Sequence, residues 1–254
     1  MKKRIHVITG HFGSGKTEFS VNYVMDLRKE IDKVAILDMD IANPYFRSRE
    51  RQKLMQDLDI DIHFNTYGFD ISEDLPAITA TVRAPLENLE YETVVDAGGN
   101  DSGARILNQF KKYFVTEDCE MLAVVNANRP DTDSLEGCLE QINSIEVETG
   151  IKIDALINNT HMLMETTPED ILKGFELCRK VSEEKKIPVR FTVCERKHLD
   201  SLVEAGAKAG YRPVVLEGAG RLPAGFEGKE SPEDLYIYPI TLQMRPSWLD
   251  VQFR

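Results

Sequence analysis

Residues that could bind a phosphate lie near the start of the chain, in the stretch GHFGSGKTEF at 10–19. The stretch fills every fixed position of the pattern G-x-x-x-x-G-K-[ST] with Gly10, Gly15, Lys16 and Thr17. Glycines let backbone N–H groups converge on phosphate oxygens, the lysine reaches the outer phosphates, and the hydroxyl is a ligand for Mg²⁺. The stretch therefore predicts a nucleotide site. Its predicted contacts are Gly10, Gly13, Ser14, Gly15, Lys16, Thr17 and Glu18.

Carboxylates close the next two apolar runs of the chain. Asp38 and Asp40 follow the run VAIL, and Asp96 ends the run ETVVD before two glycines. Acidic groups beside a phosphate loop can hold a metal ion or orient an attacking water. We expect Thr17, Asp38 and Asp96 to serve Mg²⁺, and Asp40 to position the water. Together with Lys16, Asp38 and Asp40 form the predicted catalytic set.

These groups come together only if the strands that carry them end at one edge of a sheet. Apolar runs of strand length alternate with segments of helical periodicity, which predicts an α/β fold: a three-layer sandwich with a mainly parallel sheet. The predicted strands are 5–9, 34–37, 92–96, 121–127, 154–158, 189–194 and 213–216. Ligands of such sheets bind outside the carboxyl ends of the strands. Further candidates on this ground are Asn126, Asn128, Asn158, Asn159, Glu195, Arg196 and Lys197.

Capping residues between these runs indicate where helices begin. A side chain that accepts a hydrogen bond from the first turn, followed by proline or by an acid three residues later, is typical of a helix start. The predicted starts are Lys16, Asn43 with Pro44, Asp133 with Glu136, and Thr167 with Pro168, and a further helix is expected near 102–112.

The chain is interpreted as a single domain over 1–254 with two interruptions of the alternation. Residues 60–90 form an insertion, for which we predict a short strand and a helix near 74–83. Residues 218–254 form an extension that begins in a loop rich in Gly and Pro. Three interpretations stay open for the extension: ordinary packing on the domain, a dimer contact, or a substrate lid.

The composition excludes several classes of protein. The formal net charge is −12, from 43 acidic and 31 basic residues, which disfavours a nonspecific hold on nucleic acid. No segment approaches the ~20 apolar residues of a membrane span, and the N-terminus runs directly into the phosphate loop, so we expect no cleavable signal and a cytoplasmic location. Cysteines at 119, 138, 178 and 194 are too scattered for a zinc or iron–sulfur site and are predicted to be buried, reduced thiols.

The motifs resemble those of a known family. The phosphate loop, the D-x-D after the second strand and the D-x-G-G after the third resemble the MinD/ParA/CobQ branch of the SIMIBI-class P-loop NTPases. That branch also includes the nitrogenase iron protein and the cobyrinic acid amide synthases. The stretch CERKHLDSLVEAGAKAGYRPVVL resembles the closing strand, loop and helix of the group. The resemblance covers roughly 4–217 and implies a P-loop NTPase fold.

The resemblance also implies roles for residues around the phosphates. It implies that Lys16 and Thr17 bind phosphate and Mg²⁺. It further implies that Asp38 and Asp40 serve metal binding and water activation, and that Asp96 is the Walker B acid.

Base recognition and dimer chemistry follow from the same comparison. The resemblance implies that Asn158 reads the base and that Glu195 and Arg196, in the loop after the sixth strand, line an adenine pocket. Many members have a lysine at the place of His11 that acts across a dimer, and a glycine at the place of Phe12; a lysine in trans is therefore not expected here, and a homodimer stays open. The chain has NNTH instead of N-K-x-D, which favours adenine over guanine, and it lacks the C-x-x-C of cluster-carrying members.

Several residues beside the predicted site could contact a substrate or act in a switch. They are His11, Asn43, Arg47, Gly99 and Arg129. The alternatives are a histidine merely tolerated at a variable loop position and, for the arginines between 47 and 51, a solvated helix face. The run HMLM at 161–164 predicts core packing or an exposed loop, not a soft-metal site.

These patterns predict a Mg²⁺-dependent ATP-binding protein that hydrolyses ATP slowly. In this interpretation the protein is a nucleotide-driven switch or maturation factor that acts on a protein client. The alternative is an enzyme that makes a product, an ATP-dependent ligase similar to the amide synthases or a kinase, acting on a small molecule. A nucleotide sensor without hydrolysis is the third interpretation.

Overall fold

The computed structural model describes residues 3–39, 49–64, 82–98, 106–223, 226 and 231–243. Its sheet has nine strands in the order β3-β2-β4-β1-β5-β6-β7-β9-β8, and every neighbouring pair is parallel. The predicted mainly parallel α/β fold is confirmed. The strands are β1 (Ile5–Thr9), β2 (Val34–Asp38), β3 (Asp61–Phe64), β4 (Glu92–Asp96), β5 (Cys119–Val125), β6 (Ala155–Asn158), β7 (Val189–Glu195), β8 (Arg212–Val215) and β9 (Asp234–Ile240).

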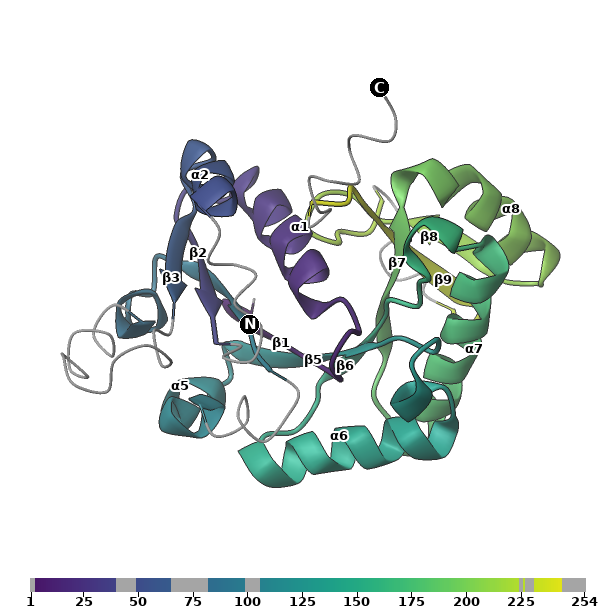
Figure 1. Cartoon of the computed structure of the whole chain (residues 1–254), viewed down its shortest axis with the longest axis horizontal. Helices are drawn as coiled ribbons and strands as arrows, with labels where there is room; N and C mark the ends of the chain where they lie inside the picture. Colours follow the sequence, from purple (N-terminus) through teal and green to yellow (C-terminus); the bar gives the residue numbers. More distant parts are fainter. Residues whose placement is uncertain are drawn as a thin grey trace.

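Helices cover both faces of this sheet, as Figure 1 shows for α1 and α6 on opposite sides. The side chains of α1 and α2 pack on one face, and those of α5, α6, α7 and α8 pack on the other. The α-helices are α1 (Lys16–Arg28), α2 (Arg49–Asp57), α5 (Lys111–Phe114), α6 (Leu135–Thr149), α7 (Pro168–Lys185) and α8 (Leu199–Lys208). Short 3₁₀ turns are η2 (Pro130–Thr132), η3 (Leu163–Glu165) and η4 (Arg196–His198). The described helices include none long and apolar enough to cross a bilayer.

The face covered by α1 is held by a cluster of four aromatic rings. Phe19 of α1 lies 5.4 Å from Tyr23, 5.6 Å from Phe191 of β7 and 5.5 Å from Tyr238 of β9, measured between ring centroids. Phe19 and Tyr238 are completely buried. Because Phe19 belongs to the first turn of α1 after the phosphate loop, this packing fixes the loop against the sheet.

The extension contributes a strand to the interior of the sheet. β9 lies between β7 and β8, so the predicted extended segment is a strand inside the sheet and not only a tail packed on it. Proline in an interior strand usually costs a ladder hydrogen bond. The backbone of Ile237 faces β8, because its carbonyl accepts a hydrogen bond from the N–H of Leu216. Pro239 is two residues further along the strand and therefore faces β8 as well, beyond the last residue pair between the two strands. Pro239 has no N–H to continue this ladder, and the pairing with β8 ends at Ile237.

The helix starts agree with the capping signals in one case and correct them in another. Thr167 and Asp170 form a full capping box with Pro168 in the first turn, as predicted. The prediction of Asp133 as a cap is wrong: Ser134 is the N-cap and its side chain accepts a bond from Gly137. Ser134 has the extended backbone that an N-cap needs, whereas Asp133 has helical dihedral angles that end η2.

The other predicted elements are described only in part. The short strand expected in the insertion is β3, and residues 82–87 are helical. Most of the helix predicted near 74–83, and the start predicted at Asn43, lie outside the described residues. Of the helix expected near 102–112, residues 106–109 are helical and α5 continues to Phe114. All four cysteines are buried and free, as predicted.

A buried ionic cluster links the amino ends of β1, β4, β5 and β7. These ends form the edge of the sheet opposite the phosphate loop. The His6 ring bonds Glu120 through Nδ1 at 2.7 Å and Glu92 through Nε2 at 3.1 Å. Arg190 donates to the second oxygen of Glu120, and Tyr23 packs edge-on against the imidazole. Burial alone would lower the pKa of His6, but the bonds to Glu120 and Glu92 outweigh it and the pKa is raised. Burial opposes ionisation of Glu120, yet His6 and Arg190 hold its pKa below the usual value.

Replacing His6 with glutamine is expected to destabilise the protein more at pH 6 than at pH 9. Because the folded pKa of His6 is raised, its stabilising contribution is full below the unfolded pKa near 6.5 and is lost as the pH rises through the folded pKa. The loss in the free energy of unfolding should therefore be larger at pH 6 than at pH 9, by an amount that reports the rise in the pKa of His6. Urea unfolding of His6→Gln and of the wild type at the two pH values measures this.

His63 in β3 provides the control of opposite sign. Burial lowers the pKa of His63, so its folded state favours the neutral ring and the stabilising effect weakens as the pH falls. The loss of stability in His63→Gln, relative to the wild type, should therefore be larger at pH 9 than at pH 6. Equal losses at pH 6 and pH 9 for His6→Gln would contradict the assigned charge on His6.

Candidate functional site

The phosphate loop connects β1 to α1 and depends on glycine at three positions. Gly10, Gly13 and Gly15 have φ of 143°, 74° and 84°, a region that residues with a Cβ rarely adopt. A Cβ on Gly10 would lie 2.3 Å from the carbonyl oxygen of Val124 in β5. Gly15 is the N-cap of α1 and supplies no side-chain bond to the first turn. The N–H groups that begin α1 therefore keep the capacity to bind an anion.

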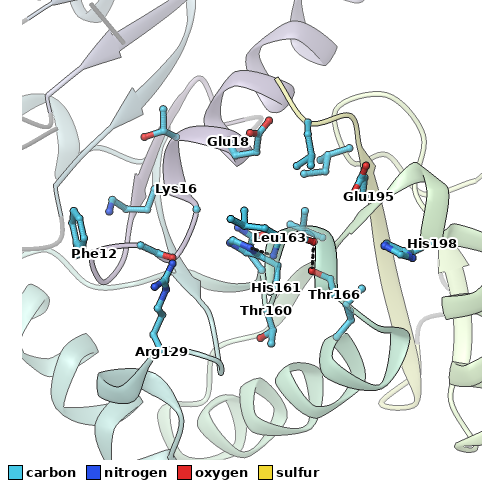
Figure 2. Close-up of a pocket in the computed structure, with 18 residues that line it drawn as sticks. Phe12, Lys16, Glu18, Arg129, Thr160, His161, Leu163, Thr166, Glu195 and His198 are labelled. Atoms are coloured by element: carbon cyan, nitrogen blue, oxygen red, sulfur yellow. Dashed lines mark hydrogen bonds between the residues drawn. The ribbon is translucent and has the colours of Figure 1, made fainter. Parts of the chain in front are cut away.

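A cavity of about 430 Å³ opens from this loop across the carboxyl ends of β6, β7 and β9. Figure 2 shows Lys16 and Arg129 at one end, and Glu195 and His198 at the other. The part between is lined by polar and apolar side chains, and the polar ones include Glu18, Thr160, His161 and Thr166. Its apolar lining consists of Leu163, Ile171, Val193, Ile240 and Leu242. The cavity thus has a cationic end at the loop and, beyond it, a chamber with both apolar and polar walls.

Carboxylates adjoin the loop at the ends of β2 and β4. The Thr17 hydroxyl donates to Asp96 at 2.7 Å and Ser20 donates to the other oxygen of Asp96 at 3.2 Å. Asp38 pairs in register with Asp96, and both are buried. The Lys16 ammonium donates to the carbonyl of His11 at 3.3 Å. The structure therefore brings together Lys16, Thr17, Asp38 and Asp96, and their roles toward phosphate and Mg²⁺ stay predictions.

The two asparagines at the end of β6 have different surroundings. Asn158 is buried, donates to the carbonyl of Ile171 at 2.9 Å and accepts a bond from the Thr160 hydroxyl at 2.8 Å. It is not among the residues that line the cavity, so the position predicted to read the base lies below the cavity floor. Asn159 does line the cavity and donates to the carbonyl of Ser14 at 2.8 Å, which ties the phosphate loop to β6.

The loop after β7 contributes in part to the far end of the cavity. Glu195 lines it and pairs with Lys197 at 2.7 Å, while its predicted contact with a base stays a prediction. Arg196 is absent from the described lining, whereas His198 is present. The Nε2 atom of His198 is buried and has no hydrogen-bond partner within the described residues.

The remaining candidates divide into two groups. The Nε2 atom of His11 lies 3.2 Å from Oδ2 of Asp131. The Nε atom of Arg129 donates to the carbonyl of Gly13 at 3.0 Å. Both therefore connect the phosphate loop with the segment after β5. The other candidates, Asp40, Asn43, Arg47 and Gly99, lie outside the described residues, and their roles stay predictions.

Several lining residues were missed by the sequence patterns. His161 lines the cavity, which corrects its interpretation as core packing or an exposed loop, although Met162, Leu163 and Met164 are exposed. Burial and the charge of Arg129 lower the pKa of His161, so its ring is neutral near pH 7. Within the described residues, no group of three His, Cys, Asp or Glu side chains gathers as a metal site.

A ladder of polar side chains on α1 holds the segment that forms one cavity wall. Glu18, Asn22 and Asp26 are spaced four apart and therefore share one face of the helix. Glu18 accepts a bond from the N–H of Gln243 at 2.6 Å, and Asn22 from the N–H of Thr241 at 3.0 Å. Asp26 accepts a hydrogen bond from the hydroxyl of Tyr238 at 2.7 Å. The wall residues Ile240 and Leu242 are thus tied to the helix that the phosphate loop begins.

The comparisons with known proteins give likenesses in structure but none in sequence. No family model matches the sequence, and no curated protein matches it significantly. Among solved structures, chloroplast FtsY from Physcomitrella patens matches 75% of the chain at 19% identity with a TM-score of 0.49. FtsY of the signal recognition particle receptor from Elizabethkingia anophelis, in complex with GDP, matches 75% at 16% identity with a TM-score of 0.46. The signal recognition particle 54 kDa protein from Aeropyrum pernix K1, in complex with GDP, matches 74% at 20% identity with a TM-score of 0.47.

The function of the chain must therefore be argued from its own residues and not from these matches. The chain spans 58%, 57% and 41% of the three matched chains, less than two thirds of each. At such identities and TM-scores the likeness carries no assignment of nucleotide, partner or reaction. Membership of the MinD/ParA/CobQ branch stays a prediction from the motifs.

Proposed function

We propose that this protein binds ATP with Mg²⁺ and hydrolyses it slowly as a nucleotide-driven switch. The observation that carries the proposal is one continuous cavity that begins at the phosphate loop and continues into the chamber at the carboxyl ends of β6, β7 and β9. Its volume of about 430 Å³ falls within the ~300–1,000 Å³ of small-molecule sites. A triphosphate suits the loop end and a purine ring suits the chamber.

The residues at the loop end fit a phosphate chain and Mg²⁺. The N–H groups at the start of α1, the ammonium of Lys16 and the buried hydroxyl of Ser14, which has no partner in the described structure, offer donors to phosphate oxygens. The hydroxyl of Thr17 would hold Mg²⁺, with Asp96 beside it at 2.7 Å and Asp38 on the neighbouring strand. When bound, Mg²⁺ neutralises charge on the outer phosphates.

The chain's own residues account for the remaining steps. Lys16 and the loop amides stabilise the negative charge that develops as water attacks in line with the leaving oxygen. We assign the positioning of that water to Asp40. Segments that follow Asp38 and Asp96 would respond to the outer phosphate and carry the switch to a protein client.

We propose adenine as the base because NNTH stands where N-K-x-D would favour guanine. Glu195 at the chamber end can accept a hydrogen bond from the exocyclic amino group of either purine, so the choice of adenine rests on the sequence motif, and the aliphatic walls pack on the ring. A ligase or kinase would need a second pocket, formed by the helix start ANPYFRSR at 42–49 and the 60–90 insertion. Of these segments, residues 42–48 and 65–81 lie outside the described structure.

Thermal unfolding with a panel of ligands tests the proposal. MgATP at ~100 times its dissociation constant should add ~2.7 kcal/mol to the free energy of unfolding, more than MgGTP at equal concentration. A panel of small carboxylates, added with and without MgATP, separates a switch from a ligase, because only a ligase should gain turnover from one of them. Absence of any shift with ATP, GTP or ADP would overturn the proposal.

A further inference from the structure

The segment after β5 presents a guanidinium to the phosphate loop. Arg129 precedes Pro130 with an extended backbone (φ −107°, ψ 133°), and its side chain crosses to the loop, where Nε donates to the carbonyl of Gly13 at 3.0 Å. A Cβ on Gly13 would lie 2.9 Å from the guanidinium carbon. Glycine at this position therefore lets the guanidinium lie directly on the loop backbone.

The segment that carries Arg129 is held rigidly. The Thr132 hydroxyl donates to the carbonyl of Asn126 at 2.8 Å, and the N–H of Thr132 bonds the carbonyl of Arg129 at 2.9 Å. The N–H of Asn128 donates to the side chain of Asn126 at 3.0 Å. A guanidinium placed from such a segment loses little additional conformational entropy when it binds a ligand.

The charge of Arg129 is available to a ligand. A guanidinium has five N–H donors, and the bond to Gly13 uses one of them. No carboxylate within the described part of the chain forms an ion pair with Arg129, and the residue lines the cavity. In Figure 2, Arg129 and Lys16 approach the same end of the cavity from opposite sides.

We propose that Arg129 is a phosphate-binding residue supplied by the same chain, which grips the phosphate chain opposite Lys16. Planar guanidinium groups match phosphate oxygens with two parallel hydrogen bonds, and both cations belong to one protomer. The site then needs no cation from a second copy of the chain. This inference rests on the proposed nucleotide site and adds a residue to it.

Binding of MgATP and of magnesium tripolyphosphate to three variants tests this role. Arg129→Ala is expected to weaken both ligands by at least tenfold in calorimetry, because the lost contact is to phosphate and not to the base. Arg129→Gln keeps a donor for the carbonyl of Gly13 but has no charge, and it should bind as weakly as Arg129→Ala. Arg129→Lys should recover part of the loss.

The outcomes separate this inference from the proposed function. Arg129→Gln with wild-type affinity would mean that Arg129 only holds the loop, and Arg129→Ala with wild-type affinity would remove any role; either result overturns the inference. Failure of the wild type to bind MgATP would overturn the nucleotide site itself. The matched control is Arg221→Ala, since Arg221 is exposed, pairs with Glu30 and lies outside the cavity lining.

A mixing experiment tests whether the arginine acts within its own chain. Lys16→Ala and Arg129→Ala should each have little hydrolysis, and an equimolar mixture should have no more than their average. Recovery of activity in the mixture would show that the two cations can come from different protomers, which would overturn the assignment to one chain.

Discussion

Replacement of Lys16 by alanine is expected to abolish the thermal stabilisation by MgATP and to lower hydrolysis by about 10²–10³-fold, the usual cost of removing one group that stabilises transition-state charge. Lys16 is buried at the start of α1, and its ammonium donates a long hydrogen bond of 3.3 Å to the carbonyl of His11, which a bound phosphate would replace. Thermal unfolding with and without MgATP, and phosphate release under saturating MgATP, measure the two effects.

The control for Lys16→Ala removes a lysine of the same charge from an exposed position. Lys180 on α7 is exposed and lies outside the cavity lining, so Lys180→Ala should keep both the stabilisation and the hydrolysis. If Lys16→Ala retained the full shift with MgATP, the phosphate loop would not be the nucleotide site and the proposed function would fail.

Replacement of Phe19 by alanine is expected to reduce the free energy of unfolding by about 3–5 kcal/mol, the range for a large aromatic side chain in a core. The ring is completely buried and contacts three other aromatic rings, from α1, β7 and β9. The alanine variant leaves a cavity that joins the helix after the phosphate loop to two strands. Chemical denaturation of the variant and the wild type measures the loss.

Phe12 provides a control of the same residue type seven positions earlier. Its side chain is 68% exposed at the tip of the phosphate loop, so Phe12→Ala should change the free energy of unfolding by less than about 0.5 kcal/mol, as surface substitutions do. A loss below ~1 kcal/mol for Phe19→Ala would mean that the four-ring cluster does not hold α1 to the sheet.

The architecture was predictable because its signals are local. Strand runs, helical periodicity and the Thr167 cap each depend on a few consecutive residues, and the order of the acids followed from the rule that parallel strands end at one edge. The place of β9 was not predictable in this way. Its pairing with β7 and β8 joins segments far apart in the sequence, and a run such as DLYIYPI reads alike in an edge strand and an interior strand.

The candidate site was predictable at the loop and less so at the chamber. The phosphate loop has fixed residue types at fixed spacing, so Lys16 and Thr17 could be named directly. At the end of β6 the sequence offers two adjacent asparagines, and successive residues of a strand point to opposite sides. Which of Asn158 and Asn159 reaches the cavity depends on where the strand ends, and a shift of one residue exchanges their roles.

The position of β9 has a consequence for synthesis of the chain on the ribosome. β8 is made before β9, yet β9 is its neighbour in the sheet and separates it from β7. Until β9 has been made, the edge of β7 is open and β8 has no strand to pair with among those described. An open parallel edge exposes unpaired N–H and C=O groups to other chains. The nascent protein therefore lacks both the Tyr238 ring of the aromatic cluster and the wall of Ile240 and Leu242 until that late strand enters the sheet.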